Sequence, residues 1–277
     1  MAQLVEHHLA KVRVAGSNPV VRSRSVVCRV ARLTAAVFVG GLVASAGACS
    51  SNARGDVVVA AASDTRDAFN EIADLLQSRD GTAVEFVFGS SGLLREQVLN
   101  GAPYDVYVSA NVGFVDEVVR AGAGVAESRR QFAVGQLALI SADGVALPAN
   151  IDSLSKVGRV VIANPAHAPY GVAAKEAMES AGIYRQLASR LILADNAADA
   201  VRIVDAGEAD VGIVALPLAI SRAHVAVSTT LHQPIRQSIV ITTRGASNEA
   251  ARRFVEALDS QQGRAILSRY GFTVDSP

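Results

Sequence analysis

From Asp56 onward, short runs of apolar residues alternate with stretches in which apolar residues recur every three or four positions. The run 57–61, all Val and Ala, is typical of a strand buried on both faces of its sheet. Within 65–78, Phe69, Ile72 and Leu76 share one helical face, and Gly81 follows as a C-terminal cap. The same patterns predict strands at 83–88, 106–108, 137–140, 159–163, 191–193, 211–215 and 238–242, and helices at 94–99, 112–121, 170–180, 198–206, 248–258 and 261–270.

Strands and helices alternate along the whole of this region, which indicates an α/β fold with mostly parallel sheets. The strands are too many for one small sheet, so we expect two lobes with a boundary near 132–135. The pattern leaves open whether the last two helices return to the first lobe.

The first 48 residues have a different pattern. Six basic residues and one acid precede an uncharged run, 33–48, which is followed by Cys49. A basic region, an apolar region and small residues before a cleavage site are typical of an export signal, and the run is too short for a confident membrane span. Residues 1–25 add nothing that a signal needs and are interpreted as an overextended start.

The four residues Ala46-Gly47-Ala48-Cys49 resemble a lipobox, in which the cysteine thiol is lipidated and becomes the mature N-terminus. The alternative is ordinary cleavage after Ala48. Residues 49–55 are small and polar, apart from one arginine, and are interpreted as a tether. The other cysteine, Cys28, lies in the leader, so the mature chain has no cysteine pair for a disulfide or a thiolate metal site.

Removal of the leader changes the charge of the protein. The leader holds six of the 26 basic and one of the 26 acidic side chains, so the mature part keeps 20 and 25, a net charge of −5. Nucleic-acid binding requires a basic surface, so nucleic acid is excluded as a partner.

Four loops that follow predicted strands share one chemistry. Each is rich in small residues, most offer a hydroxyl or an amide, and each opens a helix: 61–65, 88–92, 164–171 and 194–198. In open α/β sheets the ligand lies beyond the carboxyl ends of the strands, and a helix N-terminus binds anions through its free N–H groups. The loops therefore predict a neutral anion site, although Ser63 and Ser91 could instead be simple N-caps.

Enzyme motifs are weakly supported. The sequence 89–92 lacks the spacing of a nucleophile elbow, and no P-loop or dinucleotide fingerprint occurs. His167, His224 and His232 have no metal-ligand spacing, and His167 is interpreted as a hydrogen-bonding loop residue. An exported hydrolase that uses Ser63 or Ser91 is the alternative from another class, and a structural lipoprotein or adhesin is a third.

Several segments together resemble the periplasmic molybdate-binding proteins of ABC importers, which are type II solute-binding proteins. The matching segments span most of 56–275 and are 60–63, 88–92, 100–110, 164–171, 211–216, 234–237 and 269–272. The resemblance implies a two-lobed periplasmic-binding-protein fold with a ligand cleft between the lobes. The first lobe would hold 56–132 and 236–277, and the second lobe 133–235.

The resemblance also implies the ligand and its site. The oxyanion would be bound by Ser63 and Ser91 from the first lobe and by Tyr170 and the backbone N–H of Ala197 from the second. The ligand would be molybdate, and also tungstate, with sulfate or phosphate as the alternative. We expect no cofactor, no protein-ligated cation and no enzymatic activity. The partners would be the importer permease and its ATPase, and the protein would be a monomer.

Two positions depart from the family pattern. Ala215 stands where some members have a tyrosine whose hydroxyl contacts the ligand, so Tyr170 would supply the only tyrosyl contact. Asp64 stands beside the site, where some relatives have Asn or an apolar residue, and its charge would repel an anion. We therefore expect Asp64 to point outward and to cap backbone N–H groups.

Overall fold

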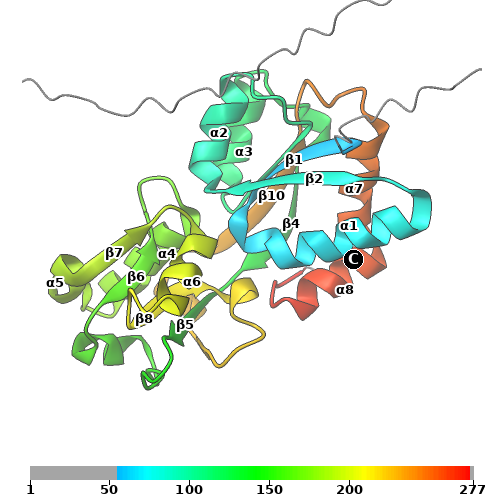
Figure 1. Cartoon of the computed structure of the whole chain (residues 1–277). Coiled ribbons are helices and arrows are strands. Elements are labelled where there is room, and N and C mark those ends of the chain that lie inside the picture. Colours follow the sequence, from blue (N-terminus) through cyan, green and yellow to red (C-terminus); the bar gives the residue numbers. More distant parts are fainter. Residues whose placement is uncertain (1–54, 275–277) are drawn as a thin grey trace, which may run out of the picture. The chain divides into compact units, whose positions relative to one another are not determined.

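The computed structural model describes residues 55–274, which form two five-stranded sheets with helices on both faces (Figure 1). The predicted leader, its cleavage site and Cys49 lie outside the described residues. Within 55–274, no helix is both long and apolar enough to cross a membrane. The same residues hold no group of three or more His, Cys, Asp or Glu side chains placed to bind a metal ion.

The first sheet has the strand order β2-β1-β3-β10-β4. All of its strands run in one direction except β10, which is antiparallel to both of its neighbours. The strands are β1 (Val57–Ala62), β2 (Val84–Gly89), β3 (Val106–Ser109), β4 (Arg130–Gly135) and β10 (Ile235–Ile241). We call this sheet and its flanking helices the first lobe.

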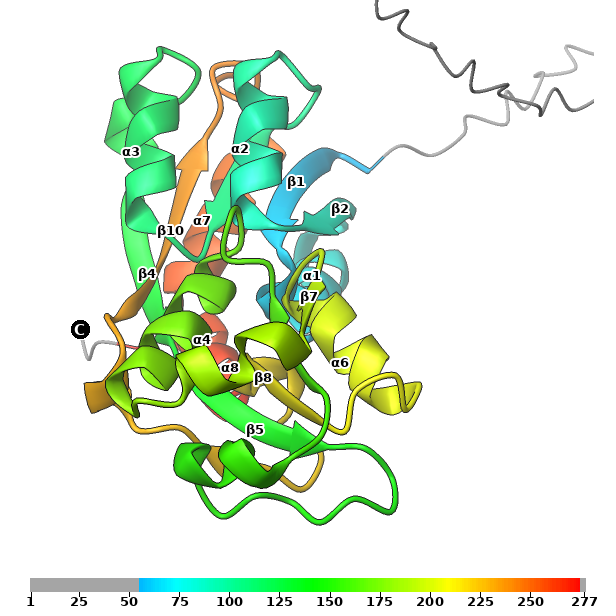
Figure 2. The same cartoon turned by 90° about the vertical axis from the view of Figure 1, so that its left-hand side faces the viewer.

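Helices cover both faces of the first sheet (Figure 2). Buried residues of α1, α7 and α8 pack on one face around Phe69 and Phe254, whereas α2 and α3 pack on the other around Tyr107. The helices are α1 (Arg66–Asp80), α2 (Ser91–Leu99), α3 (Val112–Arg120), α7 (Glu249–Asp259) and α8 (Gln261–Arg269), and a 3-10 turn η1 (Ser63–Thr65) precedes α1. The last two helices thus return to the first lobe, which the sequence pattern left open.

The second sheet has the order β7-β6-β8-β5-β9, and β5 alone runs against the other strands. Its strands are β5 (Leu137–Ser141), β6 (Val160–Ala163), β7 (Leu191–Ala194), β8 (Val211–Ala215) and β9 (Val225–Ala226). Helix α4 (Pro169–Ser180) packs on one face and α6 (Ala197–Asp205) on the other, with α5 (Tyr184–Leu187) beside α4. We call this sheet and its helices the second lobe. One strand out of five runs against the others in each sheet, so the expectation of mostly parallel sheets is confirmed.

The chain passes from the first sheet to the second between Gly135 and Leu137 and returns between Ala226 and Ile235. The first-lobe segment was expected to end at 132, whereas β4 continues in the first sheet to Gly135. The predicted cap Gly81 has a φ angle of 74°, a left-handed conformation that glycine adopts without strain.

Candidate functional site

A small closed cavity lies where the two lobes meet. Its walls are formed by strand ends and helix starts of both lobes, and it is lined by Ala62, Ser63, Asp64, Gly89, Ser90, Ser91, Ala110, Ala168, Pro169, Tyr170 and Ala197. All four residues expected to bind the oxyanion are in this set. The cavity volume is about 10 Å³, which is room for roughly one water molecule, so a larger ligand needs its walls to move apart.

Ser63 and Ser91 supply hydroxyl groups from the first lobe. Both are buried, and neither is the N-cap of a helix, because that position is Thr65 in α1 and Ser90 in α2. The Ser63 hydroxyl accepts a hydrogen bond from the Ala198 N–H at 3.2 Å, and the Ser91 hydroxyl accepts one from the Ala110 N–H at 3.1 Å. A hydroxyl that accepts a hydrogen bond still has its proton to donate, so both can donate to an anion.

The second lobe supplies Tyr170 and Ala197 from the first turns of α4 and α6. Pro169 begins α4, where its missing N–H costs nothing, and this places Tyr170 one residue later. A Cβ on Gly135 would lie 2.1 Å from the Tyr170 hydroxyl, so glycine at 135 lets this side chain reach the first lobe. Ala215 stands where some members of the family have a tyrosine. It is buried at the end of β8 and is not among the residues that line the cavity.

Ala197 is the first residue of α6, where a backbone N–H has no partner within the helix. The preceding Asn196 caps the helix, and its side chain accepts hydrogen bonds from the N–H groups of Ala198 and Asp199. Neither bond uses the N–H of Ala197, which is therefore available to a ligand. The partial positive charge of the helix start adds to the attraction for an anion.

Asp64 points into the site, and the expectation that it points outward as a cap was wrong. Its side chain lines the cavity and is only 2% exposed, while the N-cap of α1 receives no side-chain hydrogen bond. The Gln237 amide donates to Asp64 Oδ2 at 2.7 Å and to the Tyr170 hydroxyl at 3.3 Å. The 3-10 turn that precedes α1 directs Asp64 inward, because it adds a bend between the strand and the helix.

Burial controls the protonation of the Asp64 carboxyl. Burial raises the pKa of the Asp64 carboxyl to about 7, although hydrogen bonds from Tyr170, from its own backbone and from Gln237 act in the opposite direction. Burial and the neighbouring Asp64 also raise the pKa of the Tyr170 hydroxyl well above its usual range, so Tyr170 stays a neutral donor.

Sequence reasoning missed Gln237 as a neighbour of the site. Gln237 is fully buried in β10, and the register of β10 with β4 shifts between Gln237 and Ser238. Such β-bulges re-aim side chains next to functional sites. The segment 234–237 did belong to the family resemblance, but 173 residues separate Gln237 from Asp64, so only the folded chain brings them together.

Ser90 and His167 link the two lobes at one side of the cavity. The Ser90 hydroxyl donates to the His167 carbonyl at 2.7 Å and lies 2.8 Å from His167 Nδ1. The Gly92 N–H also donates to the His167 carbonyl, at 2.9 Å. A Cβ on Gly92 would lie 2.7 Å from that carbonyl oxygen, so glycine permits the close approach. His167 is thus a hydrogen-bonding loop residue, as expected.

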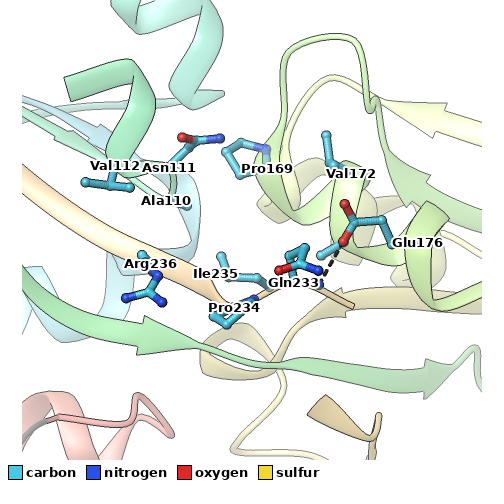
Figure 3. A pocket seen from close by; sticks show the side chains of 11 residues that line it. Ala110, Asn111, Val112, Pro169, Val172, Glu176, Gln233, Pro234, Ile235 and Arg236 are labelled. Carbon is cyan, nitrogen blue, oxygen red and sulfur yellow. Dashed lines mark hydrogen bonds between the residues drawn. The ribbon is translucent and has the colours of Figure 1, made fainter. Parts of the chain in front are cut away.

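A second cavity of about 160 Å³ also lies between the lobes (Figure 3). It shares Ala110 and Pro169 with the first cavity, but its walls carry the charged side chains of Arg236 and Glu176. Glu176 accepts a hydrogen bond from the backbone N–H of Gln233, and Arg236 is exposed. Although it is larger and includes the starts of α3 and α4, this cavity has no hydroxyl-bearing side chain among its lining residues.

Comparison with known proteins agrees with this architecture. The family model for bacterial extracellular solute-binding proteins matches residues 57–273. The molybdate-binding protein ModA of Rhodobacter capsulatus is 32% identical over 87% of this chain and 95% of its own length. That of Azotobacter vinelandii is also 32% identical, over 81% of this chain and 92% of its own.

Solved structures give the same fold. The periplasmic molybdate-binding protein of Azotobacter vinelandii superposes with a TM-score of 0.75 at 27% identity, over 79% of this chain and all of its own. The sulfate-binding protein SubI of Mycobacterium tuberculosis superposes with a TM-score of 0.66 at 16% identity, over 80% of this chain and 87% of its own, a likeness of fold alone. Sequence and structure together place this chain in the bacterial extracellular solute-binding protein family, whose members serve transport and not catalysis.

Proposed function

We propose that this chain is the extracytoplasmic substrate-binding lipoprotein of an ABC importer and that it captures molybdate, and also tungstate. The observation that carries the proposal is the convergence of uncharged donors from both lobes on one closed cavity. Ser63 and Ser91 face Tyr170 and the start of α6 there. The bound oxyanion would be delivered to the permease, and the ATPase would drive its uptake.

Uncharged donors suit a dianion that remains fully ionised over physiological pH. Hydroxyls and backbone N–H groups in a closed cavity make charge-assisted hydrogen bonds, which are about twice as strong as neutral ones. No Lys, Arg or His side chain lines the closed cavity within the described part of the chain. Selection against the smaller sulfate would come from the size of the closed cavity. The molybdate-binding relatives, at 32% identity over most of the chain, support this ligand over sulfate or phosphate.

The alternative of a serine hydrolase has little support in the site. The hydroxyls of Ser63 and Ser91 accept hydrogen bonds from the N–H groups of Ala198 and Ala110. A nucleophile would need a basic side chain that accepts its hydroxyl proton, and no side chain of the described residues accepts a hydrogen bond from either serine. Ser90 has a histidine partner, but its hydroxyl donates to the His167 carbonyl.

A thermal-shift series with molybdate, tungstate, sulfate and phosphate tests the ligand. An oxyanion at about 100 times its dissociation constant stabilises the folded protein by roughly 2.7 kcal/mol, or on the order of 5–10 °C in Tm. We expect such shifts with molybdate and tungstate and little with equal concentrations of sulfate or phosphate. Equal shifts with all four anions would contradict the selectivity, and no shift with any would contradict oxyanion binding.

The lipid anchor is tested separately at Cys49. We expect Cys49→Ser to release the protein from the membrane fraction, because the thiol that would carry the lipid is absent. The other cysteine provides a matched control, since Cys28→Ser removes a thiol from the leader and should leave the fractionation unchanged. Membrane attachment that survives Cys49→Ser would mean that the chain is held there in another way.

A further inference from the structure

Asp64 is a buried acid without a cationic partner. It is 2% exposed and lines the closed cavity, and among the described residues it takes part in no salt bridge. Its hydrogen-bond partners are uncharged: the Gln237 amide at 2.7 Å and the Tyr170 hydroxyl. An ionised carboxylate is costly in such a place, so the neutral acid is favoured.

The charged groups on the surrounding elements do not offset this burial. They are Arg66 and Asp67 on α1, Glu176 on α4, Asp199 on α6, Arg130 on β4 and Arg236 on β10, and each is exposed or half-buried. None of them is among the causes that shift the pKa of Asp64. Tyr170 is the titratable group in direct contact, and it stays neutral. His167 is hydrogen-bonded to Ser90, which lines the cavity, so any pH experiment needs a control at His167.

The Gln237 amide can pair with either protonation state of Asp64, because it carries both a donor and an acceptor. Gln237 is fully buried, and its Oε1 atom has no hydrogen-bond partner among the described residues. The two ends of an amide exchange places by a 180° flip. After such a flip the oxygen would face Asp64 and could accept a hydrogen bond from a protonated carboxyl. The Nε2 group would then be released from Asp64.

We propose that Asp64 is itself a binding residue of the oxyanion site and that each oxyanion binds together with one proton, shared between the Asp64 carboxyl and the anion. This inference rests on the proposed function. Above about pH 7, the ionised Asp64 of the unliganded site acts as an internal anion and accepts hydrogen bonds from Tyr170 and Gln237. In the liganded site, a proton taken from solvent turns the carboxyl into a hydrogen-bond donor. This proton returns to solvent when the oxyanion leaves.

The coupling predicts how affinity depends on pH. Because burial raises the pKa of Asp64 to about 7, the unliganded site is mostly protonated at pH 6 and mostly ionised at pH 8. Binding at pH 8 therefore has to include proton uptake, and the Kd for molybdate should rise about tenfold from pH 6 to pH 8. Molybdate itself stays a dianion over this range, so its own protonation does not produce the effect.

The experiment is a calorimetric titration with molybdate between pH 5.5 and 8.5, on wild type, Asp64→Asn and the control His167→Asn. Each titration is run in two buffers of different ionisation enthalpy, which counts the protons taken up. We expect the molybdate affinity of the wild type to fall about tenfold from pH 6 to pH 8, with uptake of close to one proton per oxyanion at pH 8. The molybdate affinity of Asp64→Asn should change less than threefold over the same range, and the variant should take up no proton, because its amide cannot titrate. His167→Asn should keep the wild-type dependence.

The outcomes separate this inference from the proposed function. A wild type that binds molybdate with constant affinity and without proton uptake would overturn the proton coupling and leave the function intact. A pH dependence that disappears in His167→Asn and persists in Asp64→Asn would assign the effect to His167 and overturn the role of Asp64. Proton uptake is measured on the wild type alone. The proton coupling can therefore be contradicted even if Asp64→Asn folds poorly. If wild type fails to bind molybdate even at pH 5.5, the proposed function itself is wrong.

Discussion

The two lobes present unequal walls to one cavity, although their sheets are built alike. In each sheet the first strand of a parallel trio lies between the other two, β1 between β2 and β3 and β6 between β7 and β8. The second lobe contributes uncharged donors, Tyr170 and the start of α6. The first lobe contributes the two hydroxyls but also a buried acid, Asp64, beside Gln237.

The difference explains how the proposed anion site can hold an acid, because burial favours the neutral form of the carboxyl. The same carboxylate on the protein surface would stay ionised at neutral pH and repel an anion. Enclosed between uncharged groups, Asp64 is close to half protonated at pH 7. The cavity wall of the first lobe therefore has two protonation states, with Asp64 neutral or ionised, whereas the wall of the second lobe has only one.

The largest effect is expected in the stability of the unliganded protein. Burial raises the pKa of Asp64 from 3.8 to about 7, so the folded state binds the proton more tightly than the unfolded state. This contribution is complete below about pH 4 and is lost as pH rises to 7, by about 3 kcal/mol between pH 5 and pH 8. Denaturant unfolding at both pH values should show that loss in wild type relative to Asp64→Asn.

The exposed Asp67 provides a matched control for this measurement. It lies in the first turn of α1, three residues from Asp64. Asp67→Asn should leave the pH dependence of unfolding as in wild type, because an exposed carboxyl is solvated in both states. Parallel pH curves for wild type and Asp64→Asn would show that Asp64 titrates normally in the folded protein.

The next effect concerns the donors of the first lobe. Ser63→Ala and Ser91→Ala each remove a hydroxyl that faces the cavity. A hydrogen bond to a charged group contributes about 1.5–3 kcal/mol, so each change should weaken molybdate binding roughly 10- to 150-fold. Equilibrium titration at pH 6, where Asp64 is mostly neutral, measures this loss apart from the proton effect. Unchanged affinity in both variants would remove the serines from the site.

We expect Ser90 to contribute less to molybdate affinity than its neighbour Ser91, because its hydroxyl already donates to the His167 carbonyl of the second lobe. Ser90→Ala removes the hydrogen bond to the His167 carbonyl, while the Gly92 N–H keeps its own. An ordinary hydrogen bond contributes about 0.5–1.5 kcal/mol, so affinity should fall only about two- to twelvefold. The dissociation rate should carry most of the change, which stopped-flow measurement can resolve. A loss larger than that of Ser91→Ala would reverse the two assignments.

The smallest effect is expected at Arg236. This side chain is exposed on the wall of the second cavity and does not line the closed one. Arg236→Ala should change the Kd for molybdate by less than about twofold at physiological salt and alter mainly the association rate at low salt. A loss of tenfold or more would mean that a cation holds the oxyanion and that the larger cavity is the site.

The sequence alone determined the order of the elements and the loops that carry the site. Local periodicity identifies a strand such as 57–62 or a helix such as 66–80, because burial repeats at the period of each element. It missed β4, an edge strand whose buried and half-buried residues do not alternate regularly, and the two-residue β9. The individual site residues came from the family resemblance, since small polar loops occur in many α/β proteins.

Only the tertiary structure decided which way the residues of those loops face. Asp64 has a sequence context typical of a helix cap, yet the 3-10 turn before α1 and the bulge at Gln237 turn both side chains into one buried cluster with Tyr170. These three residues are separated by 67 to 173 positions in the chain. No local pattern records such a contact, because the protonation and direction of a buried group depend on what the rest of the fold packs against it.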